Sequence, residues 1–139
     1  MKEILVDANV LVSFLTDRDE NQRKKASALF QGALEREHTL VLHTISIVEM
    51  VYVLTQLYKQ EPSQVAGAVE DLLAMPGVLA ADEVSWPLVL ERWPQTLHSL
   101  GDAIVAAAAS QGQYDAVATF DIPLRKKLAM QGSVSYWQD

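Results

Sequence analysis

The 139-residue sequence contains no cysteine, which excludes disulfide bonds, thiolate zinc sites and cysteine nucleophiles. Any bound metal ion must therefore take oxygen or histidine ligands. The sequence also contains no run near the roughly 18 uninterrupted apolar residues that a membrane span needs. Its apolar N-terminus is interrupted by Asp7 and lacks a small-residue cleavage pattern, so we do not expect a signal peptide. These absences predict a cytoplasmic protein that is not membrane-bound.

Positive charge is also scarce, with 11 lysines and arginines against 18 aspartates and glutamates and a net charge of -7. The chain therefore lacks the basic footprint of a passive nucleic-acid binder. An acidic protein can still bind phosphate if some of its carboxylates gather around one cation, so the placement of the acids matters most. Half of the residues are hydrophobic, and we find no internal repeat, low-complexity segment or linker. We expect residues 1–139 to form a single domain.

The hydrophobic pattern alternates between short buried strands and helices. The expected strands cover residues 3–6, 39–43, 78–81, 116–120 and 133–137. The expected helices cover residues 8–15, 17–37, 45–59, 62–75, 101–112 and 122–130, and a partly helical segment contains Pro87 and Pro94. This alternation predicts an α/β fold in which a mostly parallel sheet of about five strands is covered by helices on both faces.

Four acidic residues fall at the junctions between these elements. Asp7 follows the first strand, Asp121 follows strand 116–120, and Asp102 opens a helix. Glu49 lies in the first or second turn of the helix after strand 39–43. Because the carboxyl ends of parallel strands share one edge of a sheet, we expect these four carboxylates to converge.

Helix capping is the simpler explanation for each acid taken alone. Aspartate is a favoured N-cap residue, and Asp7, Asp102 and Asp121 each stand where a helix can begin. Ser46 and Glu49 match the spacing of a capping box.

Glu49 fits the capping interpretation least well. Its helix is apolar on nearly every face, and no lysine or arginine lies between Arg36 and Lys59 to neutralise a buried carboxylate. A divalent ion would neutralise a group of converging acids, and all-oxygen ligands favour Mg²⁺ or Mn²⁺ over zinc. Such sites hydrolyse phosphodiester bonds with metal-activated water.

Four segments carry a resemblance to a known family. They are VDANVLVSFL with Asp7 and Asn9, TISIVEMVYVLTQLY with Ser46 and Glu49, GDAIVAAAA with Asp102, and ATFDIPLRK with Thr119 and Asp121. In order and spacing the sequence resembles the PIN-domain ribonucleases, and among them the VapC-type toxins of bacterial and archaeal toxin-antitoxin pairs. The four segments lie within residues 4–126.

This resemblance implies a PIN-like three-layer α/β/α sandwich and an Mg²⁺- or Mn²⁺-dependent endoribonuclease. It also implies RNA as the substrate, a homodimer, and inhibition by a cognate antitoxin whose C-terminal segment lies across the active-site groove. The residues that match the family's acidic, metal-binding quartet are Asp7, Glu49, Asp102 and Asp121. Those that would orient carboxylates or water are Asn9, Ser46 and Thr119.

Two alternatives within this fold are a solitary PIN-domain nuclease that processes RNA and a non-catalytic PIN-fold binding module. A phosphoacceptor signalling domain also places acids at strand ends, but it needs adjacent acids after its first strand and a lysine after its last. The sequence has neither.

The basic residues form two clusters. Arg18, Arg23, Lys24 and Lys25 lie in residues 17–37, and their spacing favours a solvated helix face. Arg125, Lys126 and Lys127 follow Asp121 closely, so we predict that Arg125 or Lys126 contacts an RNA phosphate.

The remaining polar and aromatic residues have simpler interpretations. The histidines 38, 43 and 98 lack metal-ligand spacing, and Asp115 is expected in a turn at the opposite edge of the sheet. Core packing and a partner-binding surface are both compatible with Trp86, Trp93, Tyr52 and Tyr58, with core packing favoured for at least one tryptophan.

Overall fold

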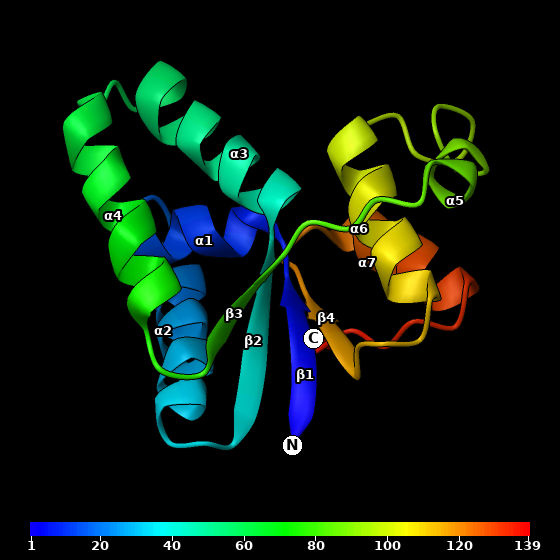
Figure 1. Cartoon of the computed structure of the whole chain (residues 1–139), viewed down its shortest axis with the longest axis horizontal. Coiled ribbons are helices and arrows are strands. Elements are labelled where there is room, and N and C mark those ends of the chain that lie inside the picture. Colours follow the sequence, from blue (N-terminus) through cyan, green and yellow to red (C-terminus); the bar gives the residue numbers. More distant parts are fainter.

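The computed structural model describes residues 1–139 and alternates strands with helices (Figure 1). The strands are β1 (Lys2–Val6), β2 (His38–His43), β3 (Val78–Ala81) and β4 (Ala116–Ala118). The helices are α1 (Ala8–Leu15), α2 (Glu20–Leu34), α3 (Thr44–Tyr52), α4 (Pro62–Ala74), α5 (Trp86–Leu90), α6 (Leu100–Ser110) and α7 (Ile122–Met130). A π-helix, Val53–Leu57, continues α3 directly.

The four strands form one sheet in the order β3-β2-β1-β4, and every neighbouring pair is parallel. This arrangement confirms the predicted α/β fold with a parallel sheet. The central strand β1 pairs with β2 from Lys2↔His38 to Val6↔Leu42 and with β4 from Ile4↔Ala116 to Val6↔Ala118. The carboxyl ends of β1, β2 and β4 therefore lie side by side.

The expected fifth strand over residues 133–137 does not form a strand. Ser135 makes only an isolated parallel bridge to Val117, with one backbone bond from Val117 N to Val134 O and one from Tyr136 N to Val117 O. The physical reason lies in β4, which is only three residues long and offers the backbone groups of one residue, Val117, to a further neighbour. The sheet therefore has four strands rather than about five.

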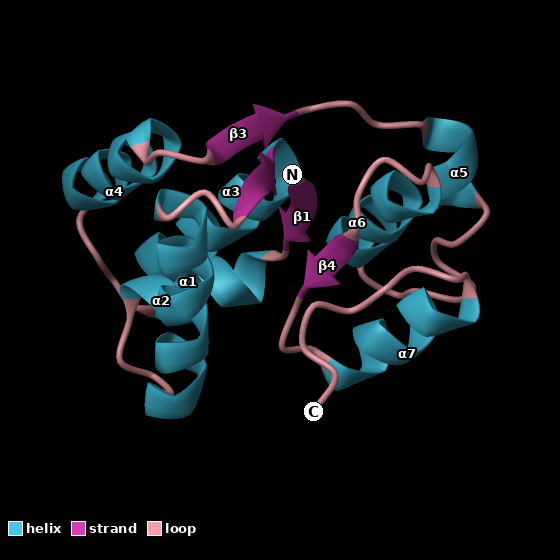
Figure 2. Ribbon diagram, turned by 90° about the horizontal axis from the view of Figure 1, so that it is seen from below, coloured by secondary structure: helices cyan, strands magenta, loops and turns pink.

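Both faces of the sheet are buried. Alternate residues of each strand point to opposite faces, and each face contributes to one hydrophobic cluster. Leu5, Val41 and Val117 belong to one hydrophobic cluster, whereas Leu40 and Leu42 belong to the other. Figures 1 and 2 show α1, α2 and α4 on one side of the sheet and α5, α6 and α7 on the other. The result is the three-layer α/β/α sandwich.

Helix α3 contacts both α1 and α6 at the carboxyl end of the sheet (Figure 1). The side chains of its residues 46 and 50 are fully buried, which is consistent with the apolar pattern of this segment. Helix α2 begins later than expected, because Asp19 caps it by accepting a hydrogen bond from Gln22 N at 3.0 Å. No helix of this protein combines the length and hydropathy that crossing a membrane requires.

Candidate active site

Asp7 lies at the junction of β1 and α1 and is only 4% exposed. Its carboxylate accepts hydrogen bonds from Ala8 N at 2.9 Å and from Thr119 Oγ1 at 2.8 Å. Its own backbone N–H donates to Ala118 O at 2.9 Å. Asp7 is therefore held by both β1 and β4, 112 residues away from Thr119 in the sequence.

Asn9 and Thr119 connect Asp7 to the loop after β4. The Asn9 side-chain amide donates to Asp7 Oδ2 at 3.2 Å, and its Oδ1 accepts from Phe120 N at 3.1 Å. Thr119 Oγ1, while donating to Asp7, accepts from Asp121 N at 3.1 Å. Asn9 and Thr119 therefore have the contacts expected of residues that orient the carboxylates.

Asp7, Glu49 and Asp102 line one pocket of about 180 Å³ at the carboxyl edge of the sheet. Glu49 comes from α3 and Asp102 from the first turn of α6, so three separate elements each supply one acid. The same pocket is lined by Ala8, Asn9, Val12, Arg18 and Val53.

Asp121 lies next to this pocket without lining it. It caps α7, where its Oδ1 accepts a hydrogen bond from Leu124 N at 3.0 Å. Its negative charge still raises the pKa values of Asp7 and Asp102. The four predicted acids are thus brought to one edge of the sheet, three inside a pocket and the fourth beside it.

Burial is the main cause of the shifted pKa values at this edge. Burial, followed by the charges of Asp7, Asp121 and Glu49 in that order, raises the pKa of Asp102 to about 7. Burial and the Asp7 charge raise the pKa of Glu49. Burial also raises the pKa of Asp7, although the hydrogen bonds from Thr119 and Ala8 act in the opposite direction. The ionised acids therefore destabilise one another.

The capping interpretation holds for some of these residues only. Asp7 and Asp121 do cap α1 and α7, but the cap of α6 is Ser99, whose Oγ accepts from Asp102 N at 3.2 Å. The suggested Ser46–Glu49 capping box is absent. The capping box does not form because α3 begins earlier, at Thr44. The His43 ring caps this helix by accepting a hydrogen bond from Ile45 N at 3.1 Å.

The Ser46 hydroxyl is the one buried side-chain oxygen or nitrogen in this chain without a hydrogen-bond partner. Ser46 is 0% exposed and lies three residues before Glu49, on the same face of α3. Buried hydroxyl groups normally have a partner, and an ordered water satisfies many of them. The hydroxyl is thus an unpaired polar group one helical turn before Glu49.

Gly101 shapes the pocket, although the sequence interpretation gave it no role. A Cβ atom at this position would lie 2.6 Å from Glu49 Cδ. Any larger residue here therefore displaces the Glu49 carboxylate. A glycine in the first turn of a helix, directly before a candidate acid, is the sequence signal for such a close approach.

The donor atoms fit a divalent cation such as Mg²⁺. All of them are oxygens, the acids repel one another, and the orphaned Ser46 hydroxyl lies on the same helix face as Glu49. No three carboxylate or histidine side chains are arranged to hold one ion together. Mg²⁺ is usually bound through only one or two protein carboxylates and keeps several waters, through which the other acids would contact it.

The other candidates lie outside the acidic pocket. Arg125 donates from Nε to Thr119 O at 3.0 Å and from Nη1 to Asp139 O at 2.8 Å, whereas Lys126 is exposed. Asp115 bonds to the backbone of Glu3 at the amino edge of the sheet, as the sequence predicted.

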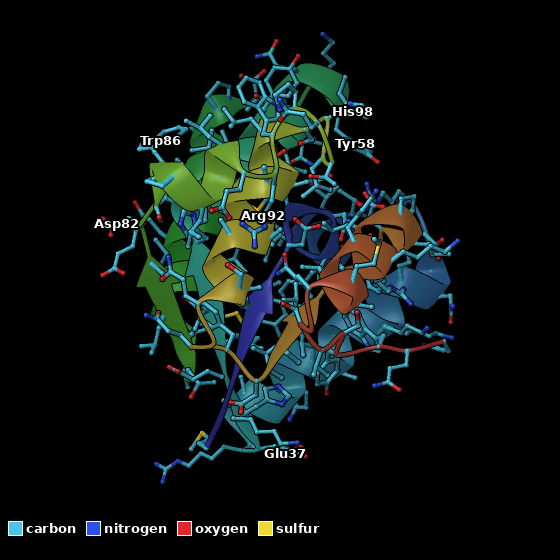
Figure 3. All side chains as sticks on the ribbon, turned by 90° about the vertical axis from the view of Figure 1, so that its right-hand side faces the viewer. Glu37, Tyr58, Asp82, Trp86, Arg92 and His98 are labelled. Carbon is cyan, nitrogen blue, oxygen red and sulfur yellow. The ribbon has the colours of Figure 1, made fainter.

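The histidines and aromatic residues divide between core and surface. His38 and His43 are buried and bonded to Leu29 O and Glu83 O. Trp93 packs against a core cluster, and its indole N–H donates to His98 O at 3.0 Å. The residues Trp86, Tyr52 and Tyr58 are exposed, and Figure 3 shows Trp86 and Tyr58 at the periphery of the molecule.

Comparison with solved structures finds close similarity in fold. One match is VapC20 of Mycobacterium tuberculosis, described as a toxin that cleaves the sarcin-ricin loop, with a TM-score of 0.70, 16% identity, and coverage of 97% of this chain and 99% of that one. Another is VapBC2 of Rickettsia felis bound to promoter DNA, with a TM-score of 0.65, 13% identity and coverage of 99% of both chains. At these identities the similarity establishes the fold alone.

A search among curated proteins finds no match. The PIN-domain family, in contrast, matches residues 4–127, which include all four acids and the whole sheet except the first two residues of β1. Together with the parallel sheet and the acids at its carboxyl edge, this match confirms the resemblance read from the sequence: the chain belongs to the PIN-domain family.

Proposed function

We propose that this protein is an Mg²⁺- or Mn²⁺-dependent endoribonuclease that hydrolyses RNA phosphodiester bonds. The observation that supports this most is the gathering of Asp7, Glu49 and Asp102 in one pocket with Asp121 beside it. Three of these acids have raised pKa values, and no lysine or arginine forms an ion pair with any of the four. Such a group of acids is stabilised by a divalent cation.

In this proposal Asp7, Glu49, Asp102 and Asp121 would hold the ion, one or two of them directly and the others through waters bound to it. The bound ion supplies water activation and neutralises charge that develops on the phosphate. Thr119 and Asn9 fix the direction of the Asp7 carboxylate through the hydrogen bonds at 2.8 and 3.2 Å. The Ser46 hydroxyl orients a water next to Glu49, and Gly101 leaves the space that the Glu49 carboxylate occupies.

We further propose that the protein acts as the toxin of a type II toxin-antitoxin pair. This rests on the fold shared with VapC20 and VapBC2 over nearly the whole of each chain. The partners that it implies are an RNA substrate, a cognate antitoxin and a second copy of this chain. Exposed apolar residues on α3 and the π-helix, such as Val48, Tyr52 and Leu57, offer surface for protein contacts.

RNA cleavage in Mg²⁺, Mn²⁺ and EDTA tests the enzymatic part. We expect cleavage with either ion, none with EDTA, and a loss of more than about 100-fold for Asp7→Asn, which removes a proposed ion ligand. The matched control is Asp71→Asn, because Asp71 is an exposed acid on α4 that does not line the pocket. Cleavage in EDTA, or equal rates for the two variants, contradicts the metal-dependent mechanism.

Expression of the wild type and of Asp7→Asn in bacterial cells tests the toxin role. We expect the wild type to arrest growth, the variant not to, and co-expression of a small DNA-binding protein encoded next to this gene to restore growth. RNA cleavage without growth arrest and without such a neighbour supports the solitary RNA-processing nuclease instead. Equal phenotypes and equal absence of cleavage for both proteins support the non-catalytic binding module.

A further inference from the structure

Arg18 is the one basic side chain that lines the acidic pocket. It lies in the loop between α1 and α2, whereas the sequence grouped it with the surface cations of α2. The pocket that it lines contains Asp7, Glu49 and Asp102. A cation in this place needs an explanation other than solvation of a helix face.

Two hydrogen bonds fix the guanidinium group of Arg18. Its Nε donates to Ser13 Oγ at 2.9 Å, and its Nη2 donates to Asn9 O at 2.9 Å. Ser13 is 0% exposed, and its hydroxyl in turn donates to Gln22 Oε1 at 2.8 Å. The chain Arg18–Ser13–Gln22 therefore joins α1 to α2 and holds the guanidinium in one position.

Arg18 is not neutralised by the acids around it. The ion pairs within 4.0 Å in this chain are Arg23–Glu20, Lys25–Asp139 and Arg92–Glu91, and none includes Arg18. Of the five N–H groups of a guanidinium, two donate to the protein, so three remain free. A fixed positive charge with free donors at the rim of an acidic pocket is suited to an anionic ligand.

We propose that Arg18 binds an RNA backbone phosphate next to the one that is cleaved, and so positions the strand across the acids. This inference rests on the proposed function, because RNA is the ligand. The planar guanidinium group of Arg18 can donate two parallel hydrogen bonds to one phosphate. Such a contact is independent of base sequence and fixes the register of the strand.

The test is binding of a fluorescein-labelled single-stranded RNA, measured by fluorescence anisotropy in EDTA over a series of salt concentrations. We expect Arg18→Ala to raise the dissociation constant about 10-fold and to reduce the slope of log affinity against log salt by about 0.7, the value for one phosphate contact on a single strand. Arg18→Lys should keep the slope and lose part of the affinity, because lysine keeps the charge without the fork.

Lys24→Ala is the matched control, since it also removes one exposed positive charge but from a residue that does not line the pocket. Circular dichroism and thermal melting establish that each variant folds. If Arg18→Ala behaves like Lys24→Ala in affinity and slope, the inference is overturned. If it leaves RNA affinity unchanged but weakens neutralisation by the antitoxin, Arg18 binds the protein partner and the RNA inference fails.

The two proposals fail separately. A wild type that binds RNA through Arg18 but cleaves none with Mg²⁺ or Mn²⁺ contradicts the nuclease proposal and keeps this inference. A wild type that cleaves RNA, with Arg18→Ala unchanged in Michaelis constant and salt slope, contradicts this inference alone. A wild type that neither binds nor cleaves RNA overturns both.

Discussion

Asp7 carries the most contacts of any acid in the site, and Thr119 is the residue that links it to Asp121. One hydroxyl donates to the Asp7 carboxylate at 2.8 Å and accepts from the Asp121 backbone at 3.1 Å. Thr119 is 1% exposed, so no water replaces it readily. The orientation of two acids that come from opposite ends of the sequence thus depends on one buried hydroxyl group.

We predict that Thr119→Val destabilises the protein by about 1–3 kcal/mol, because the valine keeps the shape but leaves Asp121 N and a buried carboxylate without their partner. It should also lower RNA cleavage about 10- to 100-fold. Urea unfolding and cleavage rates measure the two effects. Thr119→Ser should restore most of both, and Thr96→Val, at an exposed position, serves as the control. Full activity in Thr119→Val would contradict the orienting role.

Gly101 allows a second test at the scale of one residue. Gly101→Ala places a Cβ 2.6 Å from Glu49 Cδ, so the Glu49 side chain must move out of its place. We predict a loss of cleavage of about 10-fold or more. Stability should change little, because the displaced group is the end of a flexible side chain and alanine favours a helix over glycine by up to about 1 kcal/mol.

The matched control is Gly67→Ala in the middle of α4, where a Cβ meets nothing within 4 Å. This variant should gain about 0.5–1 kcal/mol of stability and keep full activity. Cleavage rates and thermal melting of the two variants separate the steric effect from helix propensity. If both variants cleave RNA equally, Gly101 does not shape the site.

At the scale of elements, the sequence predicted the four strands that form but not all of their ends, and the fifth strand, over residues 133–137, was wrong. Strand β3 matches its expected range of 78–81, and β1 and β2 each begin one residue earlier than expected. Strand β4 ends at Ala118 instead of residue 120, because Thr119 turns to bond with Asp7. The apolar pattern cannot predict this, since the partner lies 112 residues away.

Contacts between residues far apart in the sequence also limit what could be predicted of the site. The convergence of the four acids follows from parallel strands, so the sequence was enough to predict it. The positions of Arg18 and Gly101 at the pocket were missed, because they depend on contacts that only the packing of α1, α2, α3 and α6 creates. The π-helix Val53–Leu57 was also missed, since an apolar pattern does not distinguish it from a continued α-helix.

The segment after α7, residues 131–139, is held in place more by side-chain contacts than by backbone pairing. Trp137 stacks on Phe120 with ring centroids 4.6 Å apart and meets Tyr136 edge-on at 5.3 Å. Phe120 lies directly between Thr119 and Asp121, so this stacking braces the loop that carries these two site residues.

We therefore predict that Trp137→Ala destabilises the protein by about 2 kcal/mol, below the value for a fully buried tryptophan because Trp137 is half-buried. Trp86→Ala is the control, since Trp86 is 52% exposed, and it should change stability by no more than about 0.5 kcal/mol. Urea unfolding measures both. Equal effects of the two substitutions would show that the stacking does not brace the loop.

At the scale of the whole molecule, the acidic pocket makes stability depend on pH and on divalent ions. The pKa of Asp102 rises from 3.8 in the unfolded chain to about 7 in the folded protein, and the pKa values of Asp7 and Glu49 are raised as well. The folded state therefore binds more protons than the unfolded state between these values. The contribution of Asp102 to stability is therefore greatest at the lower end of this window and is lost as the pH rises through about 7.

We predict that the protein in EDTA melts at a lower temperature at pH 8 than at pH 5.5, and that Mg²⁺ raises the melting temperature more at pH 8, where the ionised acids can bind it. Asp102→Asn should remove much of this pH dependence in EDTA and melt above the wild type at pH 8, because it carries no charge to bury. Asp71→Asn should follow the wild type, since Asp71 is exposed. Parallel pH curves for the wild type and Asp102→Asn, with no greater effect of Mg²⁺ at pH 8, would mean that the four acids do not act as one cation site.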